Sequence, residues 1–386
     1  APLIAIFGFV KGMGVMHEKW AKLKWQTLIQ PSIELAANGF PLKGLIREKI
    51  EKYQKELSAD PELKKTFVDP WLGKQKKIMQ ADLAHTLQLI SHKGADVFYT
   101  GELAGTLLDF LKKEGSSLSS KDFKNYKVYS RIPFHFNKGP YEIYSASLPS
   151  TGGLALKSLF DCNSDAVPDE NHLVDCLKKY FDEREKKWGD TTKNILGHTT
   201  HLNVVDQEGN MVAMTNTLNN NFGAKMMVPR TGIILNDELD DFSTNPQSPN
   251  FYKAGVRPLS SMTPTIIFKN KNPFLIMGTP GGKSIPQNIF QVLSDYLEHN
   301  KTLTQAIKKP KIYYVPEKAA VMVENRLNQK TKNNLKKHHE LIEEDSIGNV
   351  QAIEIISLTK SRTVSDDRGE GKGFAGAPVG VPLQSY

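Results

Sequence analysis

The sequence predicts an α+β protein in which sheets are layered with helices. Helical spacing of apolar residues dominates the first 125 residues, and alternation typical of strands begins after Gly197. Further helices and one late strand follow. Helices followed by strands favour α+β layering over a parallel array of alternating strands and helices.

The elements are expected in the following order. Helices are predicted at 31–38, with Pro31 at the start and Gly39 just beyond the end, and at 81–90, 103–111, 154–160 and 172–188. Strands 201–206 and 211–218 are predicted to form a hairpin around the turn 207–210. More strands are expected at 232–235, 265–268, 274–278 and 350–357, with helices near 287–298 and 304–306.

The composition is that of a globular protein with a basic surface. The 386 residues are 39% hydrophobic and 24% charged, enough for one large or two ordinary domains. No apolar run approaches the roughly 20 residues that span a bilayer. The net charge of +8 comes from scattered basic runs without interleaved aromatic residues, so a solvated basic face is favoured over a nucleic-acid surface.

Two sequence features have competing interpretations. Cys162 and Cys176 are the only cysteines, and their spacing is not of a metal-binding type; either a disulfide or two buried thiols fits. The stretch MGTPGGKS at 277–284 resembles a phosphate-binding loop, G-x-x-x-x-G-K-[ST]. Met277 stands where that motif requires its first glycine, so a nucleotide site is not favoured.

Hydroxyl groups and histidines gather at Gly197-His198-Thr199-Thr200-His201, just before a predicted strand. One interpretation is a hydroxyl nucleophile with a histidine base. Another is cleavage of the bond before a threonine, which makes the new α-amine the base for the threonine's own hydroxyl. The third interpretation is that these residues simply begin a strand and have no role in catalysis.

Polar side chains recur downstream. Thr215, Thr217 and Asn219 have the period of two that places them on one face of a strand, lining either a wet cleft or a solvent-facing sheet. The acidic turn 236–242 could bind an ammonium group, and Ser260 with Ser261 could bind a carboxylate.

These residues together resemble the γ-glutamyltranspeptidase family. The resemblance rests on TTHLxVVD from Thr199, TxTLN from Thr215, GIxLN from Gly232, ExDDFS from Glu238, RPLSSMxPT from Arg257 and Pro280-Gly281-Gly282. The order and spacing hold from Thr199 to about Ala306. Upstream, LPSTGG at 148–153 and several shorter motifs resemble the family's large subunit more loosely.

The resemblance implies a fold and a role for each matching residue. The fold would be the αββα sandwich of N-terminal-nucleophile hydrolases, with two antiparallel sheets between helical layers. The chain would cut itself between His198 and Thr199 into a mainly helical segment, 1–198, and a segment carrying the nucleophile, 199–386, which together form one domain. Thr199 would attack a γ-glutamyl amide, and Thr217 would hold its amine. The α-amino end of the glutamyl group would be bound by Asn219, Glu238 and Asp241. Its α-carboxylate would be bound by Ser260 and Ser261, and the oxyanion by the N–H groups of Gly281 and Gly282.

The same resemblance implies small-molecule γ-glutamyl donors, water or an amine as acceptor, a self-cleaved heterodimer, and neither cofactor nor metal. It suggests an extracellular or periplasmic location, although no export signal is visible, and it leaves membrane attachment open.

Some family features differ in this chain. The family's large subunit begins earlier and supplies an arginine for the α-carboxylate; Arg368 is the candidate substitute, whereas Arg257 is expected to be structural. The loop 243–257 is short for the lid found in many members. These departures leave two alternatives: an acylase or amidase of the same superfamily with a different acyl group, or a catalytically inactive member.

Overall fold

The computed structural model describes residues 3–163, 169–189, 199–357 and 360–374. The chain forms two compact units. Unit 1 consists of Ala1–Ile132, Arg184–Thr199 and Asn216–Leu259, and unit 2 of Pro133–Glu183, Thr200–Thr215 and Ser260–Tyr386. Each unit therefore takes segments from both sides of the expected cleavage point. The division at 198/199 remains a prediction.

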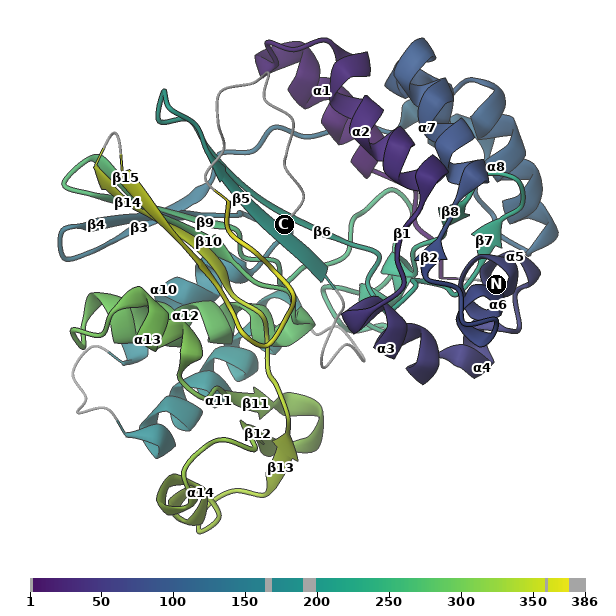
Figure 1. Ribbon diagram of the computed structural model, residues 1–386. Helices are drawn as coiled ribbons and strands as arrows, with labels where there is room; N and C mark the ends of the chain where they lie inside the picture. The colour runs from purple at the N-terminus through teal and green to yellow at the C-terminus, as the bar shows by residue number, and fades with distance from the viewer. Residues whose placement is uncertain (1–2, 164–168, 190–198, 358–359, 375–386) are drawn as a thin grey trace. The chain divides into compact units, whose positions relative to one another are not determined.

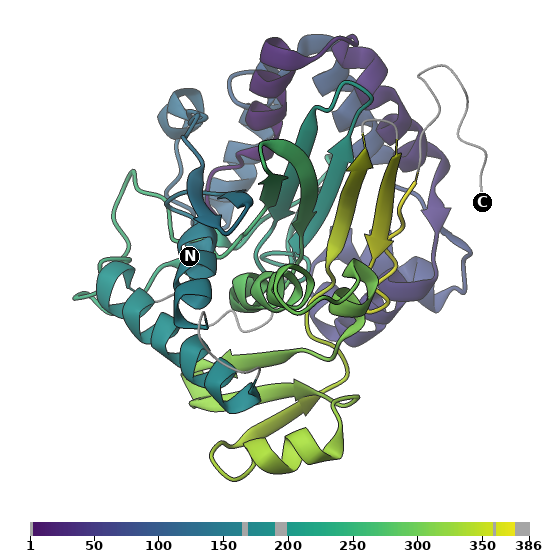
Figure 2. The same cartoon turned by 90° about the vertical axis from the view of Figure 1, so that its left-hand side faces the viewer.

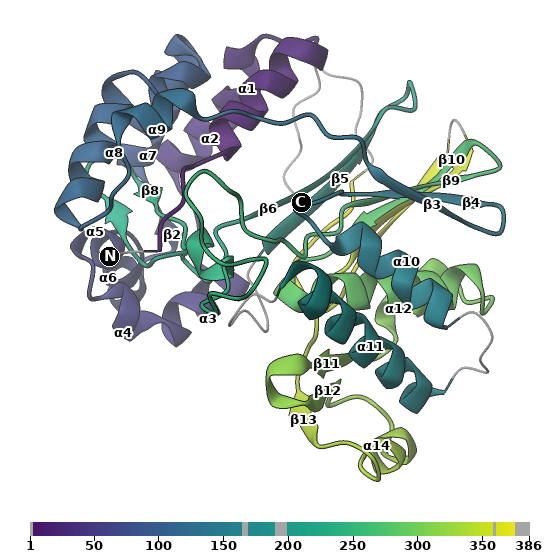
Figure 3. The same ribbon diagram turned by 180° about the vertical axis from the view of Figure 1, so that it is seen from behind.

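Unit 1 is mainly helical (Figure 1). Its core includes the fully buried Leu107, Leu111, Phe123 and Leu235, and α2 and α7 lie side by side (Figure 3). Its helices are α1 (Phe9–Trp20), α2 (Trp25–Asn38), α3 (Gly44–Lys52), α4 (Gln54–Leu57), α5 (Pro61–Leu63), α6 (Asp69–Leu72), α7 (Ala81–Lys93), α8 (Glu102–Lys113) and α9 (Ser120–Asn125). Two short antiparallel pairs complete it: β1 (Phe40–Pro41) with β2 (Lys77–Ile78), and β7 (Met227–Val228) with β8 (Ile233–Ile234).

Helix α2 corrects one prediction. It begins at Trp25, so Pro31 lies inside the helix and does not start it. The indole N–H of Trp25 donates to the carbonyl of Ile90 at 2.9 Å, which ties the first turn to α7. This tertiary anchor offsets the hydrogen bond that an internal proline removes. The predicted stop is confirmed, because Gly39 has φ 79° and donates its N–H to Leu35.

Unit 2 is built on a six-stranded, fully antiparallel sheet in the order β15-β14-β10-β9-β4-β3. The strands are β3 (Phe134–Lys138), β4 (Tyr141–Ser145), β9 (Thr265–Lys269), β10 (Asn272–Gly278), β14 (Gln351–Ser357) and β15 (Lys360–Ser365). One face is covered by α10 (Gly152–Cys162) and α12 (Ile285–Leu297), beside α13 (Leu303–Lys308) (Figure 1).

The hairpin of β5 (Thr199–Val205) and β6 (Met211–Thr217) lies on the other face of this sheet. The side-chain amide of Asn203 donates to the carbonyl of Gln351 at 2.9 Å, which fixes β5 against β14. Three of the four layers predicted for the αββα sandwich, in the order helix, sheet, sheet, are thus present in unit 2. Its second sheet is the two-stranded hairpin.

A smaller sheet completes unit 2, and the sequence did not predict it. It consists of β11 (Ile312–Val315), β12 (Ala320–Glu324) and β13 (Leu341–Glu344), with α14 (Gln329–Leu335) between the last two strands in the chain (Figure 2). Strands β11 and β12 are buried along their whole length. Strands buried on both faces lose the apolar–polar alternation that identifies a strand in sequence.

Helix α11 (Glu170–Trp188) begins in unit 2 and is joined to the end of α10 by a disulfide between Cys162 and Cys176. Their Cα atoms are 5.7 Å apart, so the bridged alternative is the one observed. Among the described residues, no helix has the length and apolarity that crossing a bilayer requires.

Candidate active site

The proposed nucleophile lies at one end of the β5–β6 hairpin. Thr199 is the first residue of β5 and is half-buried, and Thr217 is the last residue of β6. Consecutive strands of a hairpin run antiparallel, so the start of β5 and the end of β6 share one end of the ladder. The topology therefore brings these two threonines together. His198, on the other side of the expected scissile bond, lies outside the described residues.

Strand β6 ends one residue earlier than predicted, because Thr217 turns the chain. Its hydroxyl accepts the main-chain N–H of Asn219 at 2.8 Å, and Asn219 adopts a left-handed backbone with φ 75°. Asn219 thus leaves the strand, and the predicted three-residue stripe ends at Thr217. Its side-chain amide donates instead to the carbonyl of Asp237 at 3.1 Å.

The acidic turn is fixed to this loop through Asp237. The Asp237 carboxylate accepts the main-chain N–H of Asn220 at 3.0 Å and its side-chain amide at 2.6 Å. The structure therefore brings Asn219 close to the 3₁₀ turn Glu238–Asp241. Sequence reasoning included Asp237 only as part of the acidic turn 236–242 and assigned no role to Asn220; the signal for their contact was an Asn-Asn pair directly after a strand.

The carboxylates of this turn repel one another. Glu238 is half-buried, and burial together with the nearby charges of Asp241 and Asp237 raises its pKa to about 8. Its main-chain N–H is held by the Asn236 side chain at 3.1 Å. A cation bound beside this half-buried carboxyl would favour its ionised form.

Ser260 and Ser261 lie in unit 2, where the LPSTGG motif at 148–153 holds the backbone of Ser260. The N–H of Ser260 donates to Pro149 at 2.9 Å, and its carbonyl accepts the N–H of Thr151 at 2.8 Å and the Thr151 hydroxyl at 3.1 Å. The Ser260 hydroxyl accepts the N–H of Met262 at 3.2 Å. The LPSTGG motif therefore positions Ser260.

The backbone at the two adjacent glycines of MGTPGGKS favours glycine over any other residue. Gly281 has φ 138° and Gly282 has φ 56°, both in the region that L side chains rarely adopt. A Cβ on Gly281 would lie 2.5 Å from the Ser284 hydroxyl, which itself donates to the Gly281 carbonyl at 2.8 Å. This turn leads from β10 into α12 and gives the loop a defined shape.

Lys283 does not serve a phosphate. Its side chain is only 2% exposed and forms an ion pair with Glu317. The loop also follows an antiparallel strand, whereas a nucleotide loop joins a parallel strand to its crossover helix. The contacts agree with the expectation that this loop is no nucleotide site.

His201 does not fit the alternative of a histidine base. One ring nitrogen lies 2.8 Å from the Thr215 hydroxyl and the other 2.9 Å from the Asn203 side-chain oxygen. Burial lowers the pKa of the ring. The imidazole also packs on Gly278, where a Cβ would lie 2.1 Å from a ring carbon. His201 therefore joins β5 to β6 and to the sheet.

Arg368 is engaged within unit 2. Its N–H groups donate to the carboxylates of Glu324 and Asp366 and to the carbonyls of Ile307 and Lys309. These contacts number five, as many as the guanidinium has donors. The side chain is 2% exposed. This geometry gives Arg368 a structural role and leaves no donor for a substrate carboxylate.

Arg257 also contacts the protein itself, as expected for a structural residue. Its guanidinium donates to the carbonyl of Lys127 at 2.6 Å and lies over the rings of Tyr126 and Tyr129.

The fold is that of N-terminal-nucleophile hydrolases. The crystal structure of a cephalosporin acylase from Bacillus halodurans superposes with a TM-score of 0.81 over 96% of this chain and 78% of that chain, at 21% sequence identity. The α+β fold class predicted from the sequence is therefore confirmed.

The chain belongs to the γ-glutamyltranspeptidase family. The model of that family, described as Gamma-glutamyltranspeptidase, matches residues 1–195 and 169–376. The glutathione hydrolase proenzyme of Pseudomonas aeruginosa PAO1 is 30% identical over 435 residues, covering 96% of this chain and 77% of the relative. That of Bacillus subtilis strain 168 is 32% identical over 375 residues, covering 80% of this chain. The match spans only 64% of the Bacillus protein's own length.

Proposed function

We propose that this chain hydrolyses or transfers γ-glutamyl groups, with Thr199 as the nucleophile. Its hydroxyl attacks the γ-glutamyl amide, and its own α-amine, oriented by Thr217, accepts the proton and returns it to the leaving amine. The main-chain N–H groups of Gly281 and Gly282 stabilise the oxyanion, and the resulting ester passes to water or to an amine. Membership of the γ-glutamyltranspeptidase family and similarity to glutathione hydrolase proenzymes support this reaction.

The observation that carries the proposal is the carboxyl pair of Glu238 and Asp241 beside Asn219. Burial, together with the nearby charges of Asp241 and Asp237, raises the pKa of Glu238 to about 8, and a cation bound beside this carboxyl would favour its ionised form. The α-ammonium of a γ-glutamyl group is such a cation, and Asn219 provides a neutral hydrogen-bonding group next to it. Ser260 and Ser261 are proposed to bind the α-carboxylate.

The proposal requires self-cleavage between His198 and Thr199, because a threonine inside a chain has no free amine. The products are subunits of 198 and 188 residues from the 386. A denaturing gel tests this step. Wild type should give two bands of similar size, and Thr199→Ala a single band near 43.2 kDa. Thr200→Ala, the exposed neighbour on the same strand, is the matched control and should still be cut.

A chromogenic γ-glutamyl anilide tests the acyl specificity. The cleaved protein should release the aniline from the γ-glutamyl compound faster than from an unrelated acyl anilide. Intact wild-type chain without either activity would instead identify a catalytically inactive member.

The contacts of Arg368 favour one alternative substrate. Because its donors are occupied within unit 2, an acyl group without an α-carboxylate also fits the described residues. The second candidate is therefore an amidase with the same nucleophile and a different acyl group. Faster release from the unrelated acyl anilide would support it.

We also propose a compartment outside the cytoplasm. The bridge between Cys162 and Cys176 supports this location, because disulfides persist in oxidising compartments. Blocking free thiols in intact host cells tests it, since a bridged pair is not labelled until a reductant is added.

A further inference from the structure

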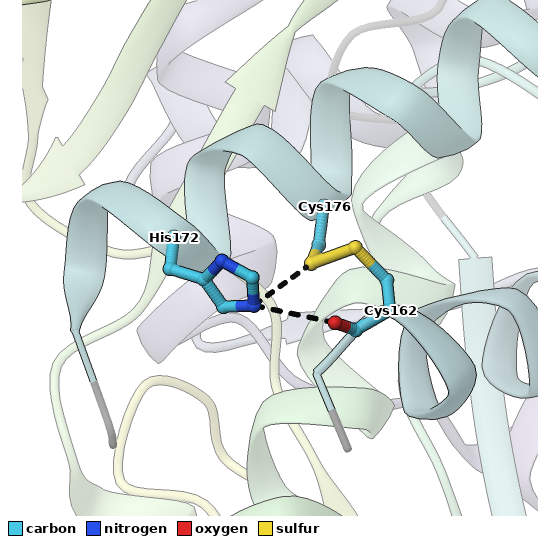
Figure 4. A group of neighbouring side chains, drawn as sticks. All are labelled: Cys162, His172 and Cys176. Carbon is cyan, nitrogen blue, oxygen red and sulfur yellow. Dashed lines mark hydrogen bonds between the residues drawn. A yellow bond between two sulfur atoms is a disulfide. The ribbon is translucent and has the colours of Figure 1, made fainter. Parts of the chain in front are cut away.

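We propose that Cys162, His172 and Cys176 form a zinc site when the disulfide is reduced. None of the three is a residue proposed for γ-glutamyl chemistry, and the proposal does not depend on that function. Their ligand atoms all lie within 4.8 Å of one another (Figure 4). Two thiolates and one imidazole are a donor set that zinc prefers.

Two helices bring these three residues together, although their spacing in the sequence matches no metal-binding motif. His172 and Cys176 are four residues apart on α11 and so lie on the same face, one turn from each other. Cys162 is the last residue of α10 and meets that face from a second element. No metal site was predicted from the sequence, because only the spacing of the two cysteines was considered and the histidine between them was not.

One of the ligand–ligand distances already matches a tetrahedral zinc site. Nε2 of His172 lies 3.5 Å from Sγ of Cys176. Zinc bonds of about 2.3 Å to sulfur and about 2.0–2.1 Å to nitrogen at a tetrahedral angle separate those two atoms by about 3.6 Å. The same geometry separates two sulfur ligands by about 3.8 Å, so the sulfur atoms must move apart after reduction. In Figure 4, Nε2 of His172 faces the sulfur of Cys176 and the main-chain carbonyl oxygen of Cys162.

The surroundings permit a metal to enter. Cys176 is 1% exposed, whereas Cys162 and His172 are half-buried, so one side of the cluster faces solvent. Three protein ligands leave the fourth position of a tetrahedral zinc ion to water. Nε2 also lies 3.2 Å from the Cys162 carbonyl, and metal binding requires the neutral ring to carry its proton on Nδ1.

The chemistry balances with a thiol or phosphine reductant. Two equivalents of a thiol reduce the bridge to two protein thiols and are themselves oxidised to one disulfide; a phosphine with water gives the same two thiols and a phosphine oxide. Zinc then binds both thiolates and releases two protons. In the zinc form, neither thiolate is free to re-form the bridge.

Cobalt titration tests the site with a visible signal. The full chain is reduced anaerobically with a phosphine, freed of reductant and titrated with Co²⁺, and then with Zn²⁺ against a chromophoric chelator. We expect one Co²⁺ per chain with thiolate-to-metal charge-transfer absorption, which Zn²⁺ abolishes. The oxidised chain should show no such band.

Two variants distinguish this site from two reactive thiols. His172→Ala keeps both cysteines and should lower zinc affinity by at least about 10- to 100-fold, the loss seen when even a group that only orients a ligand is removed. His338→Ala, an exposed histidine on the same unit, should bind like wild type. The proposal is overturned if the reduced chain gives no charge-transfer band, if His172→Ala binds as tightly as wild type, or if the oxidised chain binds equally. Far-UV circular dichroism of the reduced chain checks that its overall helix content is retained.

Discussion

Replacing Glu238 by glutamine removes a carboxyl group whose ionisation the fold opposes. The pKa of Glu238 is raised from 4.5 to about 8. The unfolded chain therefore loses this proton near pH 4.5, whereas the folded chain keeps it until about pH 8. The stabilisation from this group is fully present below pH 4.5 and is lost as the pH rises to 8. Glutamine cannot ionise, so the variant does not lose this contribution to its unfolding free energy as the pH rises.

The magnitude follows from the shift. Each pKa unit corresponds to about 1.4 kcal/mol, so the full shift sets an upper limit of about 5 kcal/mol. Glu238 is half-buried, and solvent screening reduces the effect; we expect about 2 to 4 kcal/mol. Relative to wild type, Glu238→Gln should gain that much unfolding free energy between pH 4.5 and pH 9.

Urea denaturation of both proteins at pH 5, 7 and 9 measures this difference. Glu208→Gln, in the exposed turn between β5 and β6, is the matched control and should stay within about 0.5 kcal/mol of wild type at each pH. A difference between Glu238→Gln and wild type that does not change with pH would refute the explanation by burial and acidic neighbours.

The same group links substrate binding to pH. If a γ-glutamyl ammonium binds beside Glu238, it favours the ionised carboxylate. Binding should then release a proton below pH 8, and the KM for the γ-glutamyl anilide should fall as the pH rises toward 8. Glu238→Gln should abolish this dependence.

Three other substitutions test the remaining assignments. Gly281→Ala should lower kcat by about 100-fold through a distorted oxyanion loop, while Gly105→Ala, a helical glycine with open space around its Cβ position, should not; equal kcat values in wild type and Gly281→Ala would exclude the loop from the reaction. Arg368→Ala should lose about 3 to 5 kcal/mol of unfolding free energy by removing the guanidinium from two fully buried carboxylates, Glu324 and Asp366, whereas Arg362→Ala, whose side chain is 49% exposed, should lose less than about 1 kcal/mol; a raised KM with unchanged stability would instead support a role for Arg368 in binding the substrate. His201→Gln should still undergo self-cleavage while losing about 1 to 3 kcal/mol, and an uncut but folded His201→Gln protein on a denaturing gel would contradict its purely structural role.

Much of the fold followed from periodicity in the sequence. The spacing predicted α7, α8, α11 and the β5–β6 hairpin because each has one buried and one wetter face. It failed where tertiary contacts outweighed local preference. Trp25 holds an extra turn of α2 ahead of Pro31, and β11 and β12 are buried on all sides, so their sequences show no alternation.

The candidate site was predictable as a set of residue types but not as a set of contacts. The family motif identified Asn219, yet its left-handed backbone depends on the Thr217 hydroxyl. Sequence alone also made Arg368 a plausible carboxylate ligand. One of its actual partners, Asp366, is only two residues away, but the other, Glu324, lies on β12, 44 residues earlier in the chain. Side-chain partners of this kind are set by the packing of whole elements.

The measurement that tests the central claim most directly is a mass analysis of the acyl-enzyme. The purified chain is mixed with the γ-glutamyl anilide, quenched with acid and digested, and each peptide is weighed. The account predicts a small subunit that begins at Thr199, with one γ-glutamyl group on that residue. A γ-glutamyl adduct on any other side chain, or release of the aniline by a chain that remains uncut, would contradict it.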